Sequence, residues 1–220
     1  MTMRLPNSVF VHVPRTGGMW FKDLVQRLGI KHQILTGDLD SHLPYSELPP
    51  SWRALPALGF VRHPLSWLKS RWSHLIEHKM LDDYRHFGVH RIFDAIAKPT
   101  FTETVQAVVE WNKGGVGGVG LVGLTFHRML SGLNQTSQAG NPRAGVTHLV
   151  KTESLPFAAY RFLVDVEELL GLFDVTLNEK VNGTSCLSKY HDEFDLLPSE
   201  LEAKFMASET LAMRIWKGAK

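Results

Sequence analysis

Three short apolar runs in the sequence predict strands. They cover residues 8–13, 58–61 and 146–151, and a weaker run covers residues 32–35. Continuous apolar runs rich in β-branched residues are typical of buried strands. Each of the first two ends in a turn with a proline and an arginine, and apolar residues at helical spacing follow. This repeated strand–turn–helix order predicts an α/β fold with a central, mainly parallel sheet flanked by helices.

Helical periodicity and end signals place the helices. In the first, Phe21, Leu24, Val25 and Leu28 share one face, and Gly29 is a plausible stop. The pattern predicts helices at residues 20–29, 64–78, 90–97, 100–111, 156–173 and 198–216, the fourth opening on Thr100 as its N-cap. The glycine cluster at 114–120 is interpreted as a loop. Without an internal repeat or a dividing linker, we expect one domain over residues 1–220.

Composition excludes several classes of protein. Of 220 residues, 24 are basic and 22 acidic, and no Lys/Arg block favours nucleic acid as a partner. No apolar run reaches the ~18 residues of a membrane span, and the start lacks a signal-peptide pattern. The lone Cys186 excludes an internal disulfide framework and a multi-cysteine zinc site. We therefore expect a soluble cytoplasmic protein in which the sequons at Asn134 and Asn182 carry little weight. Its oligomeric state is not indicated.

The first turn carries the chemistry of an anion site. Arg15 precedes Gly17 and Gly18, and a helix begins directly afterwards. Backbone N–H groups in the first turn of a helix have no partner within it, and the helix dipole favours negative charge. An ordinary βα turn with a solvated arginine is the alternative. The turn is not a Walker A motif, because no Lys-Ser/Thr follows its second glycine, which argues against a P-loop-type kinase using ATP.

The turn, P-R-T-G-G-M-W at 14–20, resembles the 5′-phosphosulfate-binding loop of sulfotransferases that use 3′-phosphoadenosine-5′-phosphosulfate (PAPS), whose pattern is P-K-T-G-G-T or P-K-x-G-T-T-W. The second turn, F-V-R-H-P at 60–64, is similar to the strand end that carries their 3′-phosphate arginine, and a serine follows eight residues later. The resemblance implies a nucleotide-kinase-like fold. It also implies PAPS as co-substrate, a carbohydrate or small-molecule hydroxyl as acceptor, and no metal. The cofactor-binding residues that it implies are Arg15, Thr16, Gly17, Gly18, Met19, Trp20, Arg62 and Ser70.

The likeness extends over most of the chain, through T-F-T-E-T-V at 100–105, H-L-V-K-T-E-S-L at 148–155 and V-N-G-T at 181–184, and is nearest to the carbohydrate-type branch. Two residues depart from it. Arg15 stands where the family has a lysine, and arginine keeps the charge but cannot give up a proton. Met19 replaces a threonine. A relative that binds the nucleotide with impaired turnover is therefore an alternative function.

Two further expectations concern catalysis. The resemblance implies Arg15 and His42 as catalytic residues, His42 being the base that takes the proton of the acceptor hydroxyl. Glu47 is the reserve candidate for the base, and a surface histidine in a Pro-rich loop is the alternative for His42. The segment 74–78 also matches H-x-x-E-H, an inverted zinc-peptidase signature. With no third ligand marked, a solvated helix face is the preferred interpretation.

Overall fold

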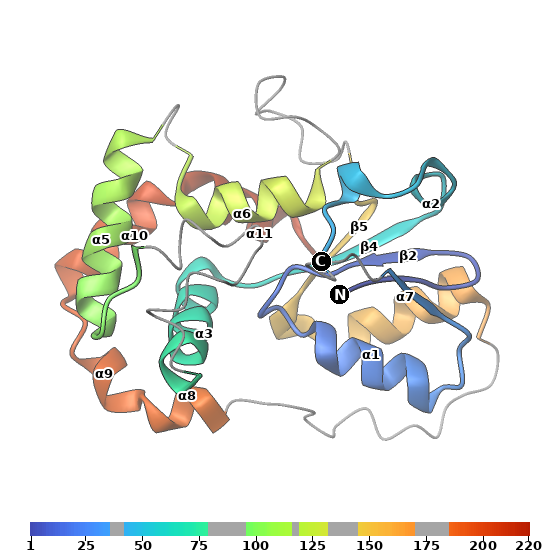
Figure 1. Ribbon diagram of the computed structural model, residues 1–220, viewed down its shortest axis with the longest axis horizontal. Coiled ribbons are helices and arrows are strands. Elements are labelled where there is room, and N and C mark those ends of the chain that lie inside the picture. The colour runs from blue at the N-terminus through green and yellow to red at the C-terminus, as the bar shows by residue number, and fades with distance from the viewer. Residues whose placement is uncertain (36–41, 79–95, 116–118, 132–144, 170–184) are drawn as a thin grey trace. The chain divides into compact units, whose positions relative to one another are not determined.

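The structure is a computed structural model that describes residues 1–35, 42–78, 96–115, 119–131, 145–169 and 185–220 (Figure 1). The chain divides into two compact units. The first comprises Met1–Arg62, His127–Gly183 and Gly218–Lys220, and the second comprises His63–Phe126 and Thr184–Lys217. The single domain expected over residues 1–220 stays a prediction. Most of the helix predicted at 90–97, and both sequons, lie outside the described residues.

The first unit is built on a five-stranded sheet in the order β3-β1-β2-β4-β5. The strands are β1 (Thr2–Arg4), β2 (Val9–Val11), β3 (Gln33–Leu35), β4 (Ala57–Val61) and β5 (His148–Lys151). β4 pairs in parallel with both β2 and β5, whereas β1 is antiparallel to its two neighbours. The expected α/β class with a mostly parallel sheet is confirmed, and the nucleotide-kinase-like detail stays a prediction. β1 was not predicted.

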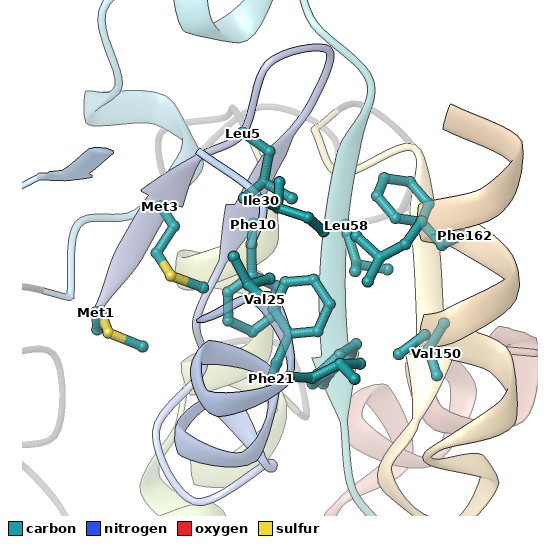
Figure 2. Close-up of a cluster of buried hydrophobic side chains, with 14 residues drawn as sticks. Met1, Met3, Leu5, Phe10, Phe21, Val25, Ile30, Leu58, Val150 and Phe162 are labelled. Atoms are coloured by element: carbon teal, nitrogen blue, oxygen red, sulfur yellow. The ribbon is translucent and has the colours of Figure 1, made fainter. Parts of the chain in front are cut away.

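One face of this sheet carries the core of the first unit. The parallel register sets Phe10 beside Leu58 and Phe60 beside Val150, so these four side chains lie on the same face. Helices α1 (Gly18–Arg27) and α7 (Phe157–Glu167) cover this face side by side (Figure 1) and contribute Phe21, Val25 and Phe162 to the same cluster (Figure 2). This core therefore packs α1 against the sheet.

The remaining short elements of the first unit follow the sheet edges. They are a 3₁₀ turn η1 (Tyr45–Glu47), α2 (Pro50–Arg53) and a 3₁₀ turn η3 (Thr152–Ser154). On the sheet face away from α1, a side chain at Gly59 would collide with Leu130 and come close to Val146, so glycine allows this close packing on β4. Among the described residues, no helix is both long and apolar enough to cross a lipid bilayer.

The second unit is helical. Its helices are α3 (Pro64–Glu77), α5 (Phe101–Gly114), the first residues of α6 (Leu121–Leu130), α8 (Ser185–Lys189), α9 (His191–Asp195), α10 (Ser199–Ser208) and α11 (Thr210–Gly218). Trp72 lies at its centre. Its indole N–H donates to the Lys98 carbonyl over 2.9 Å, and its ring meets Phe101 and Phe194 edge-on. Thr100 caps α5, as predicted, by accepting the Glu103 N–H. α6 was not predicted.

The helix predicted over residues 198–216 is wrong in one respect, because Glu209 interrupts it. Its carboxylate is fully buried and accepts the N–H groups of Val122 (3.1 Å) and Gly123 (3.0 Å) in the first turn of α6. The Asn112 amide donates to the same carboxylate over 3.1 Å. A side chain at Gly120 would fall 2.3 Å from it. The chain therefore bends where this carboxylate caps another helix.

Burial of Glu209 gives the protein a pH dependence. Burial raises the pKa of Glu209 from 4.5 to about 7, and the amide donors only partly oppose it. A raised pKa in the folded state means that folding favours the protonated form. The stabilisation is therefore complete below pH 4.5 and is lost as the pH rises through about 7.

We predict that the free energy of unfolding falls, on the order of 3 kcal/mol, between pH 4.5 and pH 8 through this one group. Urea unfolding across this range should show the slope in the wild type and lose it in Glu209→Gln. Glu202→Gln, at an exposed position on α10, is the matched control and should keep the wild-type slope. Parallel curves for the wild type and Glu209→Gln would contradict the assignment.

Candidate functional site

The turn between β2 and α1 has an unusual backbone. Arg15 has a φ of 67° and Gly17 a φ of 96°, both in the left-handed region. A side chain at Gly17 would also approach Leu155 to 2.9 Å, so glycine is required there on two counts. Thr16 is fully buried, and its hydroxyl donates to the Val13 carbonyl over 2.6 Å. The turn is thus held in shape by its own residues.

The N-terminus of α1 follows at once. Phe21 is the first residue whose N–H bonds within the helix, to the Gly17 carbonyl over 3.1 Å. The N–H groups of Gly18, Met19 and Trp20 precede it, where helix geometry supplies no acceptor. The first turn holds no acidic residue, and no side chain caps it. These donors and the positive end of the helix dipole suit an anion.

His12 lies directly behind this helix start. A Cβ atom on Gly18 would fall 2.0 Å from Cδ2 of the His12 ring, so the helix approaches the ring as closely as a glycine allows. His12 is buried, and its Nδ1 lies 3.0 Å from the amino nitrogen of Met1. The His42 ring is 4.9 Å from the His12 ring. The predicted base is therefore separated from the predicted phosphate turn by one imidazole ring.

The segment that carries His42 is anchored to the sheet. The Thr2 hydroxyl of β1 donates to the Leu43 carbonyl over 3.0 Å, which fixes the residue after His42. His42 itself is partly exposed. Glu47, the reserve candidate, is exposed at the end of η1.

Arg62 comes from the next parallel strand, directly after β4. Its guanidinium is partly buried and reaches the Arg15 carbonyl at 3.4 Å, a long hydrogen bond. Burial lowers the pKa of Arg62; the Glu153 carboxylate raises it and the Arg15 guanidinium lowers it. Two guanidinium groups and one carboxylate therefore share this edge. Among the described residues, these two arginines and the N–H groups at the start of α1 make this edge suited to an anion.

The residues after β5 complete the edge and were not assigned to the site from the sequence. The Thr152 hydroxyl lies 3.0 Å from the Thr16 carbonyl and 3.1 Å from the Val61 carbonyl. The negative charge of Glu153 acts on Arg62 and raises its pKa, and Leu155 lies where a side chain on Gly17 would be. One signal could have found them. Polar residues that follow a third predicted parallel strand should lie at the same sheet edge as those after the first two.

The other predicted binding residues lie on α1 and α3. Met19 is 49% exposed in the first turn of α1, and Trp20 packs partly against the core cluster while part of it stays exposed. Ser70 is buried in α3. Since Ser70 belongs to the second unit and Arg62 to the first, their expected pairing around one phosphate stays a prediction.

The H-x-x-E-H segment lies at the end of α3. The rings of His74 and His78 are 4.4 Å apart, one turn from each other. Across the part of the chain that the structure describes, no group of three or more His, Cys, Asp or Glu side chains is arranged to hold a metal ion.

The contact between Gly18 and His12 can be tested by one methyl group. We expect Gly18→Ala to lower the free energy of unfolding by ~1–3 kcal/mol, because its Cβ overlaps the His12 ring and the helix start must shift. Gly114→Ala is the matched control, since its Cβ meets nothing within 4 Å in the last turn of α5. It should leave stability unchanged or raise it. Equal urea midpoints for Gly18→Ala and the wild type would contradict this close contact.

Comparison with known proteins adds no assignment: no protein-family model, no curated protein and no solved structure matches this chain. The resemblance to PAPS-dependent sulfotransferases thus rests on the motifs in the sequence. The interpretation of the site rests on the geometry of Arg15, Arg62 and the start of α1.

Proposed function

We propose that the chain transfers the sulfuryl group of PAPS to a hydroxyl of a carbohydrate or small-molecule acceptor. One observation carries the proposal. Three neighbouring parallel strands end at one edge of the sheet, and there they gather a glycine turn, the N-terminus of α1 and the side chain of Arg62. Ligands of open α/β sheets bind at such edges.

The residues at this edge match the charges of the nucleotide. The N–H groups at the start of α1 and the guanidinium of Arg15 would bind the 5′-phosphosulfate, and Arg62 would bind the 3′-phosphate. Hydrogen bonds from a guanidinium to a phosphate are charge-assisted and can be bidentate. Such preorganised donors also stabilise the charge that develops on the 5′-phosphate as it leaves.

His42 would supply the base. An acceptor oxygen forms a bond to sulfur while the bond from sulfur to the bridging oxygen of the 5′-phosphate breaks, and the acceptor proton passes to His42. The products are the sulfate ester and adenosine 3′,5′-bisphosphate. The ring of His42 lies 4.9 Å from the His12 ring, which contacts the start of α1. This proximity supports His42 over Glu47.

A second candidate function is nucleotide binding without efficient turnover. The observation that favours it is Met19, an exposed apolar side chain in the first turn of α1 where the family has a hydroxyl. The Arg15 guanidinium also stays protonated and so does not release a proton to the leaving phosphate. Adenosine 3′,5′-bisphosphate would then bind, and PAPS would be neither transferred nor hydrolysed at an appreciable rate.

The proposal predicts a preference among nucleotides. Adenosine 3′,5′-bisphosphate should bind roughly 10- to 100-fold more tightly than AMP, since a charge-assisted hydrogen bond to the 3′-phosphate contributes ~1.5–3 kcal/mol. Isothermal titration calorimetry measures both affinities. Arg62→Ala should remove the preference, and Ser70→Ala should weaken it less. Arg161→Ala, at an arginine paired with Asp165 on α7, is the control and should keep it. Equal affinities in the wild type would overturn the proposal.

The role of His42 is testable without knowing the acceptor, because water can replace it. We expect His42→Ala to slow hydrolysis of PAPS by roughly two to four orders of magnitude and to leave affinity for adenosine 3′,5′-bisphosphate unchanged. His191→Ala, at an exposed histidine paired with Asp195, controls for loss of a histidine. An active His42→Ala protein would transfer the role to Glu47. A wild type that binds but does not hydrolyse or transfer would favour the second candidate function.

A further inference from the structure

Thr152 bridges the two turns that carry the arginines. Its hydroxyl lies 3.0 Å from the carbonyl of Thr16, the residue after Arg15, and 3.1 Å from the carbonyl of Val61, the residue before Arg62. Thr16 and Val61 are both fully buried. One side chain at the start of η3 thus contacts the backbone beside each arginine, although 136 residues separate it from Thr16 and 91 from Val61.

The chemistry of the side chain suits this position. A hydroxyl has one hydrogen, which two carbonyl oxygens at nearly equal distances can share. The methyl group of Thr152 lies on the side of Gly17, 3.9 Å from the position that a Cβ atom there would take. Valine has the shape but not the donor, whereas serine has the donor but not the methyl group. The two properties can therefore be separated by substitution.

We propose that Thr152 is a positioning residue that sets the separation of the Arg15 turn and the Arg62 turn, so that one nucleotide with two phosphate groups engages both at once. This inference rests on the proposed function and names a residue that acts through the backbone of the two binding turns. Binding at two linked points gains affinity only when the spacing of the points matches the ligand. A ligand with one phosphate group needs only one turn and is insensitive to the spacing.

A matched control lies at the opposite ends of the strands. The Thr147 hydroxyl, just before β5, accepts the Ala57 N–H at 2.9 Å and donates to the Ala57 carbonyl at 3.1 Å. It therefore joins the β5 segment to β4, as the contact of Thr152 with Val61 does, but at the strand ends away from the arginine turns and with no link to the Arg15 turn. A merely structural role predicts that Thr147→Val and Thr152→Val behave alike in ligand binding.

The experiment measures the ratio of the affinities for adenosine 3′,5′-bisphosphate and AMP in full-length variants, together with their urea midpoints. We expect Thr152→Val to lower this affinity ratio at least fivefold, mainly by weakening the binding of the bisphosphate. Thr152→Ser, which keeps the hydroxyl group, should keep most of the wild-type ratio. Thr147→Val should lose stability and keep the ratio. If Thr152→Val does not fold, Thr152→Ala removes the hydroxyl without adding a methyl group, and the same loss is expected.

The outcomes separate this inference from the proposed function. A wild type that binds both nucleotides equally would overturn the proposed function, and this inference with it. A wild type that prefers the bisphosphate, with an unchanged ratio in Thr152→Val or Thr152→Ala, would overturn the inference alone. A ratio that falls equally in Thr147→Val would assign the effect to strand pairing and would also overturn it.

Discussion

The parallel register of β2, β4 and β5 is the constraint on which the site depends. It sets Phe10 beside Leu58 and Phe60 beside Val150, so the apolar side chains meet on one face. A slip of one residue would turn an entire strand's apolar set to the other face, which makes the register costly to change. Because the strands point the same way, the same pairing brings the Arg15 turn, Arg62 and Thr152 to one edge. The apolar core therefore determines where these polar residues meet.

Close backbone packing then determines what this edge can be. Leu155 and the His12 ring stand where side chains on Gly17 and Gly18 would lie. The turn consequently presents N–H groups rather than side chains at the start of α1. The positive charge at this edge comes from long arginine side chains. The N–H donors are therefore rigid backbone groups, whereas the charged groups are flexible side chains.

How far the sequence predicts this arrangement depends on how local each signal is. The spacing of Phe21, Leu24 and Val25 and the Thr100 cap are local, and both predictions are confirmed. β1 has three residues, too few for alternation, and it forms because Phe10 offers a partner to Met3. The bend at Glu209 and the role of α6 depend on contacts across 86 to 87 residues, which no local pattern carries. Thr152 was missed likewise, since its partners lie far away in the sequence, in the turn after β2 and at the end of β4.

The position of Glu209 in the sequence also bears on the order in which parts of the protein can finish folding during synthesis. During synthesis, the first turn of α6 leaves the ribosome 87 residues before the group that caps Val122. In the first unit, the N–H of Asn7 waits still longer for its acceptor, Glu167, which follows 160 residues later. Until then both sets of N–H groups must be hydrated, and a hydrated helix start cannot be buried. Final packing around Val122 and Asn7 therefore waits until these two acidic residues have been synthesised.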